Sequence, residues 1–299
     1  MMPLEIADFW SQLFNFDNYG ELLVLVRNSI FAGAILGVVG GLVGVFVMKR
    51  DLAFAVHGVS ELSFAGAAAA LLLGVNVVAG SIAGSLIAAL LIGVLGTRAR
   101  DRNSIIGVLM PFGLGIGILF LALYKGRSAN KFGLLTGQIV SVDNPQLAML
   151  VIVSIAVIVA LVVIWRPLTF TSVDPEVARA KGLPVTGISL MFMVLLALAT
   201  AISIQIVGAL LVLALLVTPA AAAMRVTSSP VLTPVLSVLF AVLSVVGGIL
   251  LSLGGGLPIS PFVTTISFFI YLGCRVIEWR RSAAGRSGRV SAPKPVVVP

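Results

Sequence analysis

The sequence predicts an all-α, polytopic membrane helix bundle of about nine transmembrane helices, with eight to ten possible. Only 10% of its 299 residues are charged, whereas 60% are hydrophobic. A soluble domain carries about 25% charged residues, so this chain lacks the polar side chains that a water-facing surface needs. Apolar runs of roughly 20 residues, the length that crosses a bilayer as a helix, recur along the whole sequence.

The apolar runs divide the chain into three parts. Residues 1–21 are expected to form an extracytoplasmic or interfacial segment, residues 22–277 a transmembrane domain, and residues 278–299 a basic, disordered cytoplasmic tail. The candidate spans cover residues 22–48, 52–73, 77–97, 104–124, 146–165, 186–204, 206–224, 231–252 and 261–277. Because the sixth and seventh meet at Gln205, a very tight turn must join them.

Lysine and arginine set the expected orientation, because short cytoplasmic loops are enriched in both. If the N-terminus lies outside and the C-terminus in the cytoplasm, only Arg27, Lys125, Arg127 and Lys131 fall on the outer side. An odd number of spans, and therefore nine, satisfies this pattern. The net charge of +8 then follows from topology and gives no reason to expect nucleic-acid binding. We expect a multi-pass protein of a bacterial inner membrane, with the lipid bilayer as its solvent.

Two ionisable side chains lie deep in the second span. Glu61 lies ten residues past Asp51, and His57, the only histidine, is four residues before Glu61. At this spacing the two share a helix face, and Ser60 and Ser63 add hydroxyls nearby. A charged group at this depth costs about 3 kcal/mol, so a compensating interaction is needed.

An imidazole and a carboxylate on one face can form half of a site for Zn²⁺, Mn²⁺ or Fe²⁺. Two ligands bind weakly, as a transit site requires, and a second copy of the chain would raise the ligands to four. Two alternatives remain from the residues alone. The pair could be a structural hydrogen bond between buried groups, or it could be a proton relay.

The predicted cytoplasmic loop around residues 169–184 contains a short helix. Asp174 is a candidate N-cap, Pro175 suits the first helical position, and Gly182 is a candidate C-terminal stop. The residues alone leave an ordinary connector between two spans as the alternative.

The sequence has a single cysteine, Cys274, which excludes an intrachain disulfide. It has no Walker A motif, so any ATP hydrolysis would require a separate subunit.

Glycine and proline within the spans predict close packing and a bend. Gly66 and Gly208 are candidate positions for close helix contact, and Pro219 removes a backbone hydrogen bond within the seventh candidate span.

Three regions resemble the permease family of zinc, manganese and iron ABC importers. The first is 48–74, MKRDLAFAVHGVSELSFAGAAAALLLG, which is similar to the family's second span. There Ser60 falls on the family's Ser and Gly66 on its Gly, whereas His57 occupies the family's Asp position and Glu61 its His position. The second is FGLLTGQIVSVD at 132–143, and the third comprises DPEVARAKGL at 174–183 and VGALLVLALLVTPAAAA at 207–223.

The resemblance implies an importer's membrane subunit that is itself no enzyme and holds no permanent cofactor. It implies three protein partners: a cytosolic ATPase dimer, an extracytoplasmic metal-binding protein and a second permease copy, with a homodimer expected. His57 and Glu61 would be metal ligands. The coupling helix that docks on the ATPase would comprise Asp174, Pro175, Glu176, Val177, Ala178, Arg179, Lys181 and Gly182. The alternatives are a stand-alone secondary transporter that uses Glu61 and, more remotely, an intramembrane enzyme.

Overall fold

The structure, a computed structural model, describes residues 19–96, 99–126, 133–134, 142–253 and 259–289. Within these ranges the regular secondary structure is entirely helical, as the composition predicted. The principal helices are α2 (Tyr19–Leu25), α3 (Arg27–Lys49), α4 (Ala53–Leu73), α5 (Val77–Leu95), α6 (Ala99–Leu123), α8 (Asn144–Val173), α9 (Pro175–Ala180), α10 (Val185–Val207), α11 (Val212–Leu216), α12 (Thr218–Val226), α13 (Leu232–Leu253) and α14 (Ile259–Arg289).

Eight helices in the described part of the chain are long and apolar enough to cross a membrane. They correspond to eight of the nine predicted spans, with ends that differ by a few residues in most cases and by more in α8 and α14. The prediction of one continuous span over 206–224 is wrong. That region forms a 3-10 turn, η2 (Ala209–Leu211), followed by the short helices α11 and α12.

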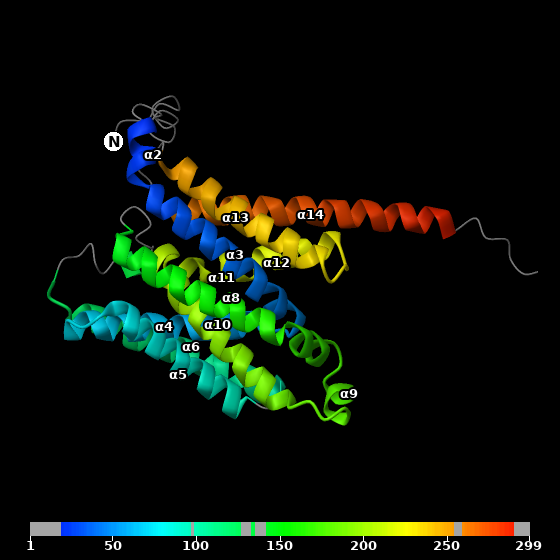
Figure 1. The fold of residues 1–299 in the computed structure, drawn as a ribbon, viewed down its shortest axis with the longest axis horizontal. Coiled ribbons are helices and arrows are strands. Elements are labelled where there is room, and N and C mark those ends of the chain that lie inside the picture. Colours follow the sequence, from blue (N-terminus) through cyan, green and yellow to red (C-terminus); the bar gives the residue numbers. More distant parts are fainter. Residues whose placement is uncertain (1–18, 97–98, 127–132, 135–141, 254–258, 290–299) are drawn as a thin grey trace, which may run out of the picture.

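The helices form three groups, which Figure 1 shows in sequence colours. Helices α4, α5 and α6 pack together on one side of the bundle, and α12, α13 and α14 pack together on the other. Between them lie α3, α8 and α10, of which α3 packs along α13 and α10 along α5. The short segment from η2 to α12 contacts α3 and α4, so it lies inside the bundle and not on its rim.

Helices α4 and α5 approach at backbone distance through glycine. A Cβ on Gly66 would lie 2.2 Å from the carbonyl oxygen of Gly80 and 3.0 Å from the Cα of Gly84. Small residues that allow such approach are the usual means by which helices associate in lipid. The packing role predicted for Gly66 therefore has a direct structural basis, and this contact fixes α4 beside α5.

Replacement of Gly66 by valine is expected to destabilise the bundle by about 1–3 kcal/mol, because the new side chain meets rigid backbone that cannot move aside. The measurement is the midpoint of thermal unfolding in detergent. Gly107→Ala is the matched control, because a Cβ at Gly107 of α6 meets nothing within 4 Å. Equal midpoints for the two variants would contradict the close α4–α5 contact.

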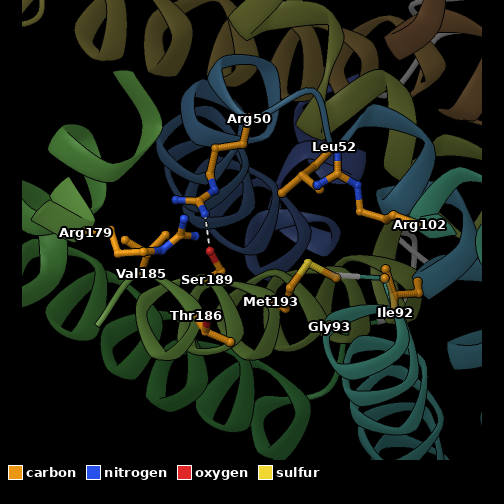
Figure 2. Close-up of a pocket in the computed structure, with 11 residues that line it drawn as sticks. Arg50, Leu52, Ile92, Gly93, Arg102, Arg179, Val185, Thr186, Ser189 and Met193 are labelled. Atoms are coloured by element: carbon orange, nitrogen blue, oxygen red, sulfur yellow. Dashed lines mark hydrogen bonds between the residues drawn. The ribbon is translucent and has the colours of Figure 1, made fainter. Parts of the chain in front are cut away.

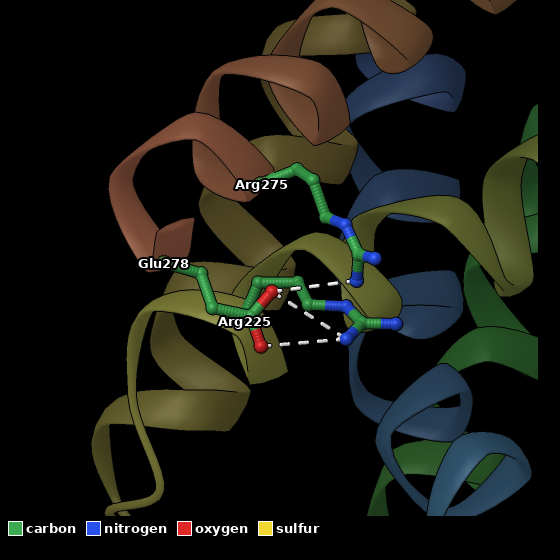
Figure 3. A network of polar contacts seen from close by, with 3 residues as sticks. All are labelled: Arg225, Arg275 and Glu278. Atoms are coloured by element: carbon green, nitrogen blue, oxygen red, sulfur yellow. Dashed lines mark hydrogen bonds and ion pairs between the residues drawn. The ribbon is translucent and has the colours of Figure 1, made fainter. Parts of the chain in front are cut away.

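Helix α14 extends beyond the predicted end of the membrane domain. It continues to Arg289, so residues 278–289 of the expected disordered tail are helical, and residues 290–299 lie outside the described residues. Figure 3 shows Glu278 of α14 between Arg225 of α12 and Arg275, at 3.4 and 3.5 Å. Because Arg281 also donates to the carbonyl of Val226, polar contacts join this part of α14 to the end of α12.

Candidate functional site

His57 and Glu61 lie in the first half of α4. Glu61 is about 12 Å along a helix about 30 Å long, counting 1.5 Å per residue from Ala53. Its side chain is only 7% exposed, whereas the side chain of His57 is 30% exposed. The pair therefore combines an enclosed carboxylate with an imidazole that can still be reached from outside the chain.

The two side chains face each other without a hydrogen bond. His57 Nε2 lies 3.7 Å from Glu61 Oε1, which is longer than a hydrogen bond. His57 Nδ1 and Glu61 Oε2 are both buried and have no hydrogen-bond partner. Buried polar atoms are normally paired, so these two unpaired atoms make the position a candidate ligand site.

The separation also suits coordination. Two ligand atoms that each lie about 2.1 Å from one metal ion can be at most about 4.2 Å apart. The 3.7 Å between His57 Nε2 and Glu61 Oε1, the other nitrogen and oxygen of the pair, lies within that limit. In the described part of the chain, no third His, Cys, Asp or Glu joins the pair in a cluster. Among the described residues, one protomer therefore supplies at most two side chains of these types at this position.

The serines beside the pair hold neighbouring helices in place. The Ser60 hydroxyl donates to the carbonyl of Ala209, at 3.1 Å, and so ties α4 to η2. The Ser63 hydroxyl lies 2.8 Å from that of Ser81 on α5, which in turn donates to the carbonyl of Ala201 on α10. Both serines were predicted to support the pathway by which an ion would cross the membrane. The structure shows them in interhelical hydrogen bonds, a role that sequence spacing alone did not indicate.

A break in the helical path lies directly beside this site. Gly208 has a φ of +82°, a conformation that glycine adopts without strain, and it separates α10 from η2. Pro219 lies in the first turn of α12, and the break between α11 and α12 falls at Val217. Because the Ser60 hydroxyl donates to the carbonyl of Ala209, movement of this broken segment would also displace Ser60, which is next to Glu61 in the sequence.

The predicted short helix in the loop is present as α9. Asp174 Oδ1 accepts hydrogen bonds from the backbone of Glu176 and Val177, at 3.1 and 3.0 Å, as an N-cap does. Pro175 occupies the first turn, and Gly182, at φ +80°, ends the turn that follows. Figure 1 shows α9 at one end of the bundle, projecting beyond the long helices.

The faces of α9 have different neighbours. Glu176, Val177, Arg179 and Lys181 are exposed. Ala178, which was expected in the coupling helix, is fully buried: its methyl group faces this chain and anchors α9 to the bundle, so it adds nothing to the exposed surface of the helix. The charged side chains and Val177 are left as the outward surface.

A model of the ABC 3 transport family matches residues 23–278, which is most of the chain. The chain belongs to this family. The resemblance seen in the sequence is thereby confirmed. The segment 132–143 that was part of that resemblance lies mostly outside the described residues.

Individual relatives agree with the family. The chain is 28% identical over 228 residues to the manganese transport system membrane protein MntC of Halalkalibacterium halodurans, covering 76% of this chain and 78% of that protein. It is 26% identical over 245 residues to the high-affinity zinc uptake system membrane protein ZnuB of Haemophilus influenzae, covering 82% and 94%. Its fold matches a chain of PsaBC from Streptococcus pneumoniae in complex with Fab, with a TM-score of 0.78, 25% identity and coverage of 87% and 95%.

Proposed function

We propose that this ABC-3 family member is the membrane permease subunit of an ATP-driven importer and that its cargo is a bare divalent transition metal ion. The proposal rests on two buried atoms without a hydrogen-bond partner, His57 Nδ1 and Glu61 Oε2, which lie one helical turn apart on α4. The relatives named for manganese and zinc transport support the class of cargo. One nitrogen and one oxygen ligand suit Mn²⁺, Fe²⁺ and Zn²⁺ alike.

The partially exposed imidazole supports a second copy of the chain as a partner. The His57 side chain is 30% exposed, and Phe54, three residues earlier on α4, is 69% exposed. A two-fold axis beside this face would bring two imidazoles and two carboxylates around one ion. Four ligands would complete the site, yet a site formed between two moving subunits can also open to release the ion.

The remaining partners follow from the two ends of the bundle. On the cytoplasmic side, an ATPase dimer would dock on the exposed face of α9, which the structure anchors through Ala178. On the other side, an extracytoplasmic metal-binding protein would deliver the ion. On this proposal the chain is a transport subunit and not an enzyme, and it lies in the inner membrane with its N-terminus outside and its C-terminus in the cytoplasm.

The test of this function is uptake of radioactive Mn²⁺ into proteoliposomes. We expect uptake only when the chain is reconstituted with its ATPase, with ATP on the side of the membrane that holds the ATPase and the metal-binding protein on the other side. The competing secondary transporter would act by itself. Gradient-driven uptake by the chain alone, unaffected by ATP, would therefore overturn the proposal.

A further inference from the structure

Three arginines from separate parts of the sequence line one cavity at the α9 end of the bundle. Arg50 follows α3, Arg102 lies in the first turn of α6, and Arg179 lies on α9. The cavity has a volume of about 150 Å³. Figure 2 shows the Arg50 and Arg179 side chains reaching toward one another above Ser189, with Arg102 entering from the opposite wall.

Among the described residues, no acidic side chain pairs with the positive charge of this cavity. In the described ranges, ion pairs occur only at His57–Glu61 and around Glu278, and none involves these three arginines. Arg50 donates to the neutral hydroxyls of Thr171, Ser172 and Ser189. Arg102 has a buried Nε without a hydrogen-bond partner.

The positive charge of Arg102 acts on Arg50. Burial, and then the positive charge of Arg102, lower the pKa of Arg50. Half-buried like charges repel one another, and an unpaired buried donor is costly in itself. An anion in the cavity would relieve both costs at once.

The start of α10 adds to the same potential. Val185 and Thr186, its first two residues, line the cavity, and no side chain caps this end of the helix. The N-terminus of a helix carries a partial positive charge and free N–H groups, which favour anions. Enrichment of arginine in cytoplasmic loops would explain on which side these residues lie, but not why they converge on one cavity.

We propose that this cavity binds a phosphate group, held by Arg50, Arg102 and Arg179. The planar guanidinium matches phosphate oxygens with paired hydrogen bonds. The cavity lies where the apolar span of α3 ends and where that of α6 begins at Arg102. The ends of membrane spans lie at the level of the lipid headgroups. The phosphate belongs either to the headgroup of an anionic lipid or to a soluble ion, and this binding is independent of the metal site on α4.

The experiment compares the purified, delipidated chain with two variants that each remove one cavity arginine. Arg102→Gln removes the unpartnered guanidinium. Arg179→Gln changes an exposed side chain, so its effect does not depend on tolerance of a buried substitution. The control is Arg275→Gln, which removes the same charge from α14 outside the cavity. Binding is measured by native mass spectrometry with phosphatidylglycerol or phosphatidylcholine, and by titration with inorganic phosphate.

We expect phosphatidylglycerol or inorganic phosphate to bind the wild type and the control with the same affinity. Each cavity variant should bind the ligand with an affinity at least about ten-fold lower, because a hydrogen bond to a charged group is lost. Retention of phosphatidylglycerol alone identifies a lipid, and binding of inorganic phosphate alone identifies a soluble ion. Binding of neither ligand, or equal binding by all four proteins, overturns the proposal.

Discussion

Substitution of either His57 or Glu61 by alanine is expected to reduce ATP-driven Mn²⁺ uptake to background, a loss of at least about 100-fold. Each change removes one of the two ligands that a protomer offers, and with a two-fold site it removes two of four. Loss of ligands from an already weak site leaves too little interaction energy to strip water from the ion in the middle of the membrane. Uptake into proteoliposomes measures the effect.

The matched control is Glu21→Gln, which alters an exposed carboxylate on α2 and should transport normally. Co-purification with the ATPase must be retained in all variants, because His57 and Glu61 lie in α4 and not on α9. Normal uptake by both alanine variants would remove the metal site while leaving the family assignment intact. Uptake lost together with ATPase binding would indicate misfolding, and thermal unfolding separates this case.

Combined replacement of Glu176, Arg179 and Lys181 by alanine is expected to abolish co-purification with the ATPase and, with it, ATP-driven uptake. These side chains form the exposed charged face of α9, whereas Ala178 and the Asp174 cap remain to keep the helix folded. Rim charges govern encounter and orientation in an interface, so their joint loss should affect assembly more than stability.

A matched triple change at the opposite end of the bundle controls for lost charge. Glu21, Arg27 and Lys125 are also one acid and two bases, and all three are exposed. Their replacement by alanine should leave ATPase binding unchanged. If both triple variants bind the ATPase equally well, α9 is a connector and not the coupling helix.

Hydropathy predicted most of the fold because a bilayer admits few alternatives to long apolar helices. The predicted span 52–73 lies within one residue of α4, and 231–252 within one residue of α13. The same criterion failed over 206–224, since a broken apolar segment and a continuous one have the same hydropathy. The signals of the break were Gly208, which needs a positive φ, and Pro219, and neither depends on hydrophobicity.

The candidate site was predictable only to the extent that it is local. His57 and Glu61 lie one helical turn apart, so their spacing alone brought them together. The bonds from Ser60 to Ala209 and from Ser81 to Ala201 join residues more than 100 positions apart, which one sequence cannot reveal. The arginine cavity was missed for the same reason, because Arg50, Arg102 and Arg179 each resembled an ordinary loop charge.

Anomalous scattering from Mn²⁺ in an experimentally determined structure of the assembled importer tests the central claim most directly. We expect a peak about 2 Å from an imidazole nitrogen of His57 and a carboxylate oxygen of Glu61, with the same two side chains of the second copy completing the site. Manganese bound elsewhere in the membrane region, with His57 and Glu61 directed into lipid, would contradict it.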